Sequence, residues 1–375
     1  METTGSTSPN HTLVFRKFAL RDLSVPAVFA KDLSDDLAQD FLALSLASFE
    51  DHLNLTRDLR RADGKPFLVQ AGYFDQALPD ARAALREDVH LIGMNIGLGA
   101  AVFEFALFCL SQSTLLRDFG NAEAEHSPRG LNGYPPGFWM REEGATLRNE
   151  VFVNATNTLL PQDVRRYEAA LFLTILTLRF VWLHELYHAV NGHIAFVDKE
   201  EGIPLGFNET DKALVRSIDS TTLKLLELDA DQSALNTLCH ITLQGMENVE
   251  GIRRLSVDDT LRLGLLGAYA GTWILDEHLF RSKNDVPEDH PPPSLRRQNL
   301  IRTFASVVAP QFGDAKGLHD GVLDEITALS RVIERFPPGD LLRAEMSDIV
   351  LQTALDTDQE VLDNIRGHLA PYRYS

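Results

Sequence analysis

Residues 162–191 read QDVRRYEAALFLTILTLRFVWLHELYHAVN, an apolar run that ends on a turn rich in histidine and glutamate. Pro161 and Asp163 suit the first turn of a helix, and Gly192 suits the position just after its end. The pattern therefore predicts one long helix that lies in the core of the protein.

Further helical patterns follow this segment. A second helix is expected over 217–244 with Gly245 as its terminator, and a third apolar helix over 262–280. The proline-rich turn at 290–293 precedes another expected helix, which runs through Arg296 and Ile301. The fold class that this order predicts is mainly α (α+β), with a small sheet at most.

The part of the chain before residue 162 gives weaker signals. Alternating apolar residues and glycines over 89–97 predict a strand or extended segment, followed by a buried helix over 103–116. Residues 120–144 are rich in proline and glycine and predict a loop.

The charge of the chain limits the classes of partner. Its 375 residues include 35 Lys and Arg against 54 Asp and Glu, a formal charge of −19. Such a field repels phosphate backbones, so nucleic acid is not expected as a partner. Met1 to His11 lacks the charged-then-apolar pattern of a signal peptide. We expect a cytoplasmic protein with a flexible tail over residues 1–12.

The two cysteines, Cys109 and Cys239, lie in apolar stretches and form no C-x-x-C pair. We therefore expect buried free thiols in a reducing compartment, and neither a disulfide framework nor a thiolate metal site.

Two apolar segments invite comparison with a membrane span. Residues 169–183 are few and include Arg179, whereas the longer stretch 90–110 carries Glu104. A span usually needs about 20 apolar residues without a central charge. We expect both to be core segments and no span to be present; for 90–110 the membrane reading stays open as the alternative.

The segment His184-Glu185-Leu186-Tyr187-His188 carries the chemistry. Residues four apart share one helix face, so both imidazoles can point at one metal ion. Glu185 can reach a water molecule in the open coordination position of that ion. The alternative is a helix with two ordinary histidines beside a surface glutamate.

Glu227-Leu228-Asp229-Ala230-Asp231 on the second helix strengthens the metal hypothesis. A zinc peptidase needs a third protein ligand, which Glu227 can supply. Metal-bound imidazoles usually donate their other N–H to a carboxylate, and Asp231 can accept it from a histidine of the first helix. The alternative is a solvated acidic stripe.

In order and combination, these motifs resemble the gluzincin metallopeptidases of the type of the CAAX prenyl proteases and the HtpX heat-shock proteases. Gly192-His193 and the later element His290-Pro291-x-x-x-x-Arg296 agree with that family, and the resemblance covers roughly residues 165–300. The clear transmembrane helices of those relatives are missing. As a soluble protein with this motif, the chain is also loosely similar to the phage-exclusion peptidase Lit.

The resemblance implies a zincin-like helical peptidase, built as one domain over 13–375 with its metal-binding core at about 160–300. One Zn²⁺ per chain would be held by His184, His188 and Glu227, with Glu185 as general base. A peptide or protein would be the substrate. Its carbonyl oxygen would be stabilised by His290 or Arg296, for which a proline-rich turn with a structural ion pair is the equal alternative.

His193 stands five residues after His188, a spacing that does not match a third histidine ligand in metzincins, so it is expected to support a ligand or cap the helix. Residues 91–97 are the candidate sheet edge for pairing with an extended substrate. The rival to a peptidase is a catalytically silent or latent, zinc-stabilised binding or regulatory protein.

Overall fold

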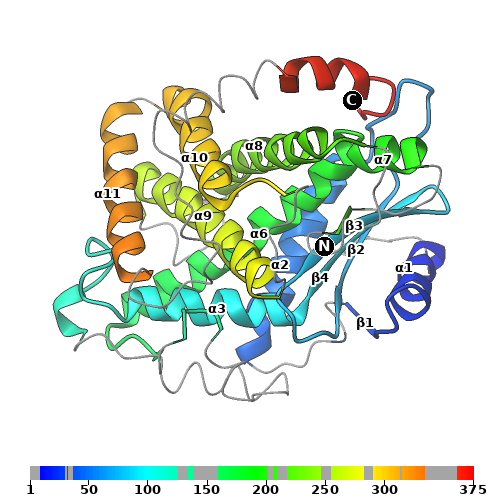
Figure 1. Cartoon of the computed structure of the whole chain (residues 1–375). Coiled ribbons are helices and arrows are strands. Elements are labelled where there is room, and N and C mark those ends of the chain that lie inside the picture. The colour runs from blue at the N-terminus through cyan, green and yellow to red at the C-terminus, as the bar shows by residue number, and fades with distance from the viewer. Residues whose placement is uncertain are drawn as a thin grey trace.

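The computed structural model describes residues 9–29, 32, 37–125, 134–138, 159–201, 207–208, 218–245, 255–282, 290–312, 315–333 and 361–375. These residues form a mainly helical structure with one small mixed sheet, so the expected α+β class with predominant helix is confirmed (Figure 1).

The secondary structure elements have the following bounds. The helices are α1 (Pro9–Arg21), α2 (Leu37–Leu55), α3 (Ile96–Leu110), α6 (Val164–Val190), α7 (His193–Glu201), α8 (Ser220–Gly245), α9 (Val257–Ser282), α10 (Pro293–Thr303) and α11 (Ala315–Ile333). The strands are β1 (Ala27–Val28), β2 (Val69–Phe74), β3 (Ala81–Arg86), β4 (Val89–Asn95) and β5 (Phe207–Asn208). Residues 361–369 are also helical.

The long helices lie close to where the sequence predicts them. Asp163 caps α6, because its side chain accepts hydrogen bonds from the backbone N–H groups of Arg165 and Arg166. At the other end Asn191 is the C-cap, and Gly192 adopts the left-handed conformation with φ of +83°. The expected flexible tail overlaps the structure at residues 9–12, which belong to α1.

The region before α6 differs from the prediction in two ways. The buried helix α3 begins at Ile96, seven residues earlier than the expected start at residue 103. Two strands, β2 and β3, precede the one strand that the sequence predicts, over 89–97. Of the predicted loop 120–144, only 120–125 and 134–138 fall within the described residues.

The sheet has the order β1-β2-β4-β3-β5, in which β2 and β4 are parallel and the other pairs antiparallel. β4 pairs along its length with β2 on one side and β3 on the other. The prediction that residues 91–97 form a free sheet edge is therefore wrong. Every residue of β4 is buried, as suits a central strand covered on both faces.

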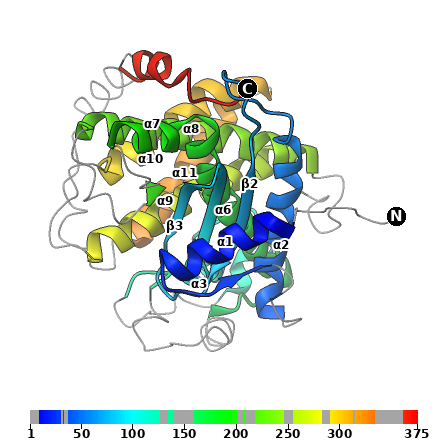
Figure 2. The ribbon, with the colours of Figure 1, turned by 90° about the vertical axis from the view of Figure 1, so that its right-hand side faces the viewer.

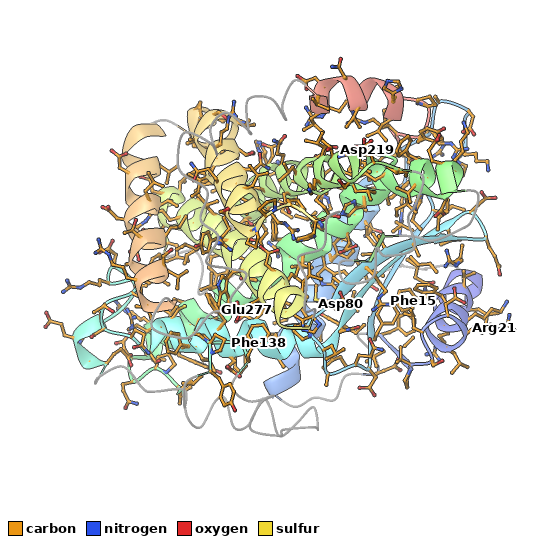
Figure 3. All side chains as sticks on the ribbon, in the orientation of Figure 1. Phe15, Arg21, Asp80, Phe138, Asp219 and Glu277 are labelled. Atoms are coloured by element: carbon orange, nitrogen blue, oxygen red, sulfur yellow. The ribbon has the colours of Figure 1, made fainter. Side chains whose placement is uncertain are left out.

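Helix α1 lies on one face of the sheet, and the other helices lie on the opposite face (Figures 1 and 2). On one face, Phe15 of α1, labelled in Figure 3, points towards the sheet. Its ring stacks on that of Phe74 of β2, with the two centroids 5.2 Å apart. On the other face, Tyr73 and Ile92 join the main core together with residues of α2, α3 and α6. The alternation along β2 thus serves two separate cores.

Helix α6 lies at the centre of the main core and contacts α2, α3, α8 and α9 as well as strands β3 and β4. It is long and apolar enough to cross a membrane, but 83% of its most apolar window is buried inside the chain. Buried core helices of soluble proteins have the same property, so this feature alone is weak evidence for a span. The stretch 90–110 is divided between β4 and α3.

Close helix packing around α6 depends on small residues. A Cβ atom at Gly267 of α9 would lie 3.1 Å from the backbone nitrogen of Thr177, and one at Gly271 would lie 3.3 Å from Phe180. The missing side chains let α9 approach α6 closely. Cys109 and Cys239 are buried and free, as expected. Burial raises the pKa of Cys239 to about 12, so this thiol is unreactive.

Arg166 fixes the start of α6 against the preceding chain. This fully buried guanidinium donates hydrogen bonds to five carbonyl oxygens at the end of α3 and in the segment after it, namely those of Leu110, Gln112, Leu115, Leu116 and Phe119. Glu125 lies 3.6 Å away and balances the charge. Arg166 therefore sets the position from which α6 enters the core.

His90 of β4 makes stability depend on pH. Its ring lies between Phe67 and Tyr374, and burial lowers the pKa of His90 to about 3. As pH falls below about 6.5, the His90 imidazole therefore becomes protonated in the unfolded chain but stays neutral in the folded protein. The stabilising contribution is complete above pH 6.5 and is lost as pH falls towards 3, with a slope of up to about 1.4 kcal/mol per pH unit.

We expect His90→Gln to remove this component of the pH dependence. Urea unfolding at pH 7, 6 and 5 measures it, and His368→Gln, at an exposed position, serves as the control. Equal slopes for wild type and His90→Gln between pH 6 and 5 would contradict the assignment.

Candidate metal centre

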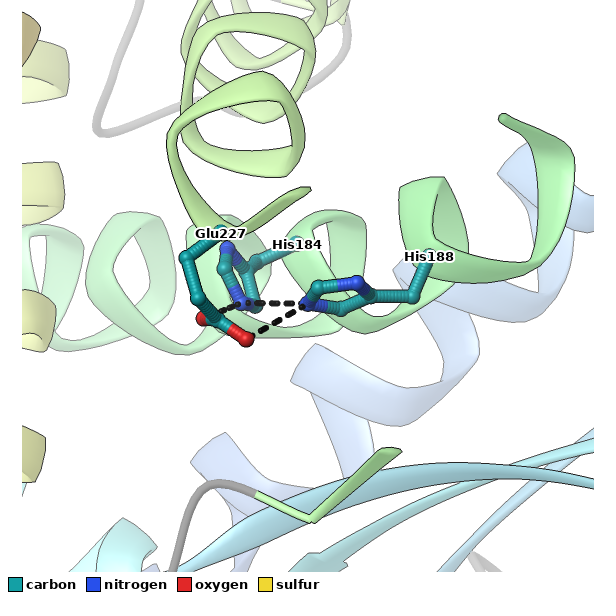
Figure 4. Close-up of side chains that lie close together, drawn as sticks. All are labelled: His184, His188 and Glu227. Atoms are coloured by element: carbon teal, nitrogen blue, oxygen red, sulfur yellow. Dashed lines mark hydrogen bonds and ion pairs between the residues drawn. The ribbon is translucent and has the colours of Figure 1, made fainter. Parts of the chain in front are cut away.

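Three side chains from two packed helices converge in the core beside the sheet (Figure 4). His184 Nε2 lies 3.0 Å from His188 Nε2, and the Glu227 carboxylate oxygens lie 3.4 Å from His184 Nε2 and 3.6 Å from His188 Nε2. All three residues are buried. The described structure thus brings together the three ligands that the sequence predicts and contains a group that could hold a metal ion.

These distances fit a metal ion. Two ligand atoms that each lie about 2.0–2.1 Å from a tetrahedral zinc ion are roughly 3.3 Å apart. The three observed separations bracket this value. Three protein ligands of the His, His and Glu type also match a site that leaves one coordination position open.

The orientation of His184 supports metal binding through Nε2. Its Nδ1 atom lies 2.9 Å from Asp231 Oδ1, so this nitrogen faces the carboxylate. The Nε2 lone pair is then directed at the group of ligands. Asp231 occupies the place that the sequence predicts for it.

Arg296 lies behind Asp231. It is fully buried and donates from Nε and Nη2 to the two Asp231 oxygens at 2.7 and 3.1 Å. Its Nη2 atom is also 3.9 Å from Glu227 Oε2. These contacts form a buried ion pair. Arg296 holds the carboxylate that orients His184.

His290 is linked to Arg296 indirectly, through a carboxylate that both residues contact. Its Nε2 atom lies 3.1 Å from Asp276 Oδ1 of α9, and Arg296 Nη1 lies 3.4 Å from that same oxygen. His290 is buried, with 2% of its surface exposed. The structure therefore places His290 in contact with Asp276 of α9, a carboxylate that Arg296 also contacts.

His193, at the start of α7, supports the second histidine. Its Nδ1 atom lies 3.0 Å from His188 Nδ1, and its Nε2 atom lies 3.1 Å from Asp229 Oδ2. Gly192 reverses the chain just before this residue, so the ring can face back onto α6. A supporting position for His193, which the sequence predicts, agrees with these contacts.

Two residues of this hydrogen-bonded cluster, Asp229 and Arg366, were not predicted from the sequence. Asp229 accepts hydrogen bonds from Asn191, His193 and Arg366. Burial alone would raise the pKa of Asp229, but the contacts with His193 and Arg366 outweigh it and hold that pKa well below its usual range. The proximity of Asp229 to Glu227 in sequence was a signal; Arg366, 137 residues from Asp229, gave none.

Glu185 lies on α6 next to His184 and is buried, with 2% of its surface exposed. Carboxylates in such surroundings are stable only with charged or hydrogen-bonding neighbours.

Comparisons with known proteins give no family for the chain: no family model, no curated protein and no solved structure matches it.

If the cluster binds metal, zinc will stabilise the folded protein. A metal ion present at about 100 times its Kd increases the free energy of unfolding by about 2.7 kcal/mol. With an unfolding entropy of about 2 cal/mol/K per residue, this raises the melting temperature of the chain by roughly 3 °C. Differential scanning calorimetry with zinc and with a chelator measures the change.

The variants His188→Ala and Glu227→Ala should lose this response to zinc. His240→Ala, on the same helix as Glu227 but outside the cluster, should keep it. A zinc response of wild-type size in both ligand variants would show that the metal binds elsewhere.

Proposed function

We propose that this protein is a zinc-dependent endopeptidase that hydrolyses peptide bonds in polypeptide substrates. The observation that carries the proposal is the matched orientation of the two histidines. Both Nδ1 atoms face an acceptor, Asp231 for His184 and His193 for His188, while both Nε2 atoms face the Glu227 carboxylate. This is the arrangement that supporting residues impose on zinc-bound imidazoles.

Zinc is favoured over other metals by the type of ligand. Imidazole nitrogens with one carboxylate suit zinc, whereas magnesium and calcium prefer sites made of oxygen atoms. Three protein ligands leave room for a water molecule or a substrate oxygen, whereas structural zinc sites usually have four protein ligands.

A zinc ion held by His184, His188 and Glu227 would acidify a water molecule and polarise the substrate carbonyl group. Glu185 would take a proton from the attacking water and pass it to the departing amine. The oxygen adds to the carbonyl carbon, the C–N bond breaks, and a carboxylate and an amine result. Asp231 and Arg296 keep His184 in the orientation that the reaction needs.

The ion-pair contacts of Arg296 support a positioning role for this residue. Its Nε and Nη2 atoms engage Asp231, and its Nη1 atom faces Asp276. The earlier alternative, in which Arg296 or His290 stabilises the oxyanion, stays a prediction.

A second candidate function follows from the burial of the cluster. His184, His188 and Glu227 are each only 1% exposed. Such burial also suits a metal that ties α6 to α8 in a catalytically silent or latent protein. The acidic composition and the buried free thiols support a cytoplasmic location under either function.

The variant Glu185→Gln separates the two functions. It should bind about one zinc ion per chain and hydrolyse an unfolded, fluorophore-quenched polypeptide roughly 10²- to 10⁴-fold more slowly than wild type, because it lacks the general base. Metal content is measured by atomic spectroscopy and hydrolysis by fluorescence.

Glu168→Gln, at an exposed position of the same helix, is the matched control and should retain wild-type rates. Hydrolysis by Glu185→Gln at the wild-type rate, with zinc bound, would refute the general-base role. A zinc-loaded wild type that leaves all such substrates intact would favour the silent, metal-tied protein.

A further inference from the structure

The contacts behind His188 reach far beyond the two helices that carry the ligands. They run from His188 through His193 and Asp229 to Arg366, with distances of 3.0, 3.1 and 2.6 Å. Arg366 lies in the helical segment 361–369, which packs over the outer side of α8 (Figure 1).

Proton positions along this path are fixed by chemistry. Metal binding through His188 Nε2 uses the lone pair of that nitrogen, so the ring proton lies on Nδ1 and is donated to His193 Nδ1. The proton of His193 then lies on Nε2 and is donated to Asp229 Oδ2. One arrangement of protons therefore serves all three residues, and it requires Asp229 to be a carboxylate.

Asp229 accepts as many hydrogen bonds as its two oxygens can readily hold. Oδ2 receives those of His193 and Asn191, and Oδ1 receives two from Arg366, from Nε at 2.8 Å and from Nη2 at 2.6 Å. Asp229 is 2% exposed. A buried carboxylate in this position needs a cationic partner, and Arg366 is the one arginine in the described residues that contacts it.

The segment that carries Arg366 is docked by its own contacts. Leu362 packs with Leu225 and Leu228 of α8 and with Leu295 of α10. Further along, the Tyr374 backbone N–H donates to the carbonyl oxygen of Val190, at the end of α6. The segment therefore touches both helices that supply metal ligands.

We propose that residues 361–375 form part of the metal centre, with Arg366 acting through Asp229 and His193 as a positioning residue for His188. The inference rests on the proposed metal site and assigns to it a regulatory coupling: displacement of this segment weakens metal binding, and metal binding stabilises the docked segment.

The first test is the zinc affinity of Arg366→Gln, measured by competition with a chromophoric chelator. Loss of a residue that supports a metal ligand typically weakens affinity about 10- to 100-fold. Arg366→Lys, which restores the charge, should recover part of this loss. The d–d spectrum of the cobalt-substituted protein should change in Arg366→Gln and return towards wild type in Arg366→Lys.

Arg262→Gln is the matched control. Arg262 is also a partly buried arginine with carboxylate partners, in this case Asp118, Asp259 and Glu325, but it lies on the side of α9 that faces α11. This variant should bind zinc with wild-type affinity. The proposal would be overturned if Arg366→Gln bound zinc with wild-type affinity and its cobalt-substituted form gave the wild-type spectrum.

A second measurement uses the wild-type protein and needs no variant to fold. Hydrogen exchange with and without zinc should show slower exchange of the backbone amides of 361–369 when the metal is bound, because the coupling is reciprocal. Protection of α6 and α8 with unchanged exchange of 361–369 would overturn the proposal.

The outcomes also separate this proposal from the proposed peptidase activity. A wild type that binds no zinc would overturn both. A wild type that binds zinc with the expected dependence on Arg366, yet hydrolyses no polypeptide, would leave the positioning role established and refute the peptidase.

Discussion

The constraint on which the structure depends is the burial of polar side chains in the middle of an apolar helix. His184, Glu185 and His188 lie at the centre of the core, where a polar group without a partner costs several kcal/mol. The surrounding elements supply the partners: α8 contributes Glu227, Asp229 and Asp231, α10 contributes Arg296, and α7 contributes His193. The contacts that pack these helices around α6 are therefore also the contacts that build the candidate metal centre.

Local spacing made much of this centre predictable. Residues four apart on a helix share a face, so the convergence of His184 with His188, and of Glu227 with Asp231, follows from the pattern alone. Helix ends were also predictable where a specific residue marks them, as Asp163 and Gly192 do for α6.

The features that could not be predicted from the sequence depend on contacts between distant parts of the chain. The central position of β4 reflects its parallel pairing with β2, and no turn between the two strands signals that pairing. Near the start of α3, the backbone of Ala77 lies against Gly97, where a Cβ would be 2.1 Å from a carbonyl oxygen. Asp229, two residues from Glu227, points to a different side of α8, so a search for carboxylates on one helix face passes over it.

The wide separation of these residues in sequence has a consequence for folding kinetics. The chain between Asp229 and Arg366 must close a loop of 137 residues before the last contact of the network can form. Contacts of such high sequence separation are usually made late, since the entropy of loop closure is lost before any contact compensates for it. A metal ion bound to the finished centre would then slow unfolding more than it accelerates folding. For this chain, the metal would act as a kinetic lock on the native state and not as a template for reaching it.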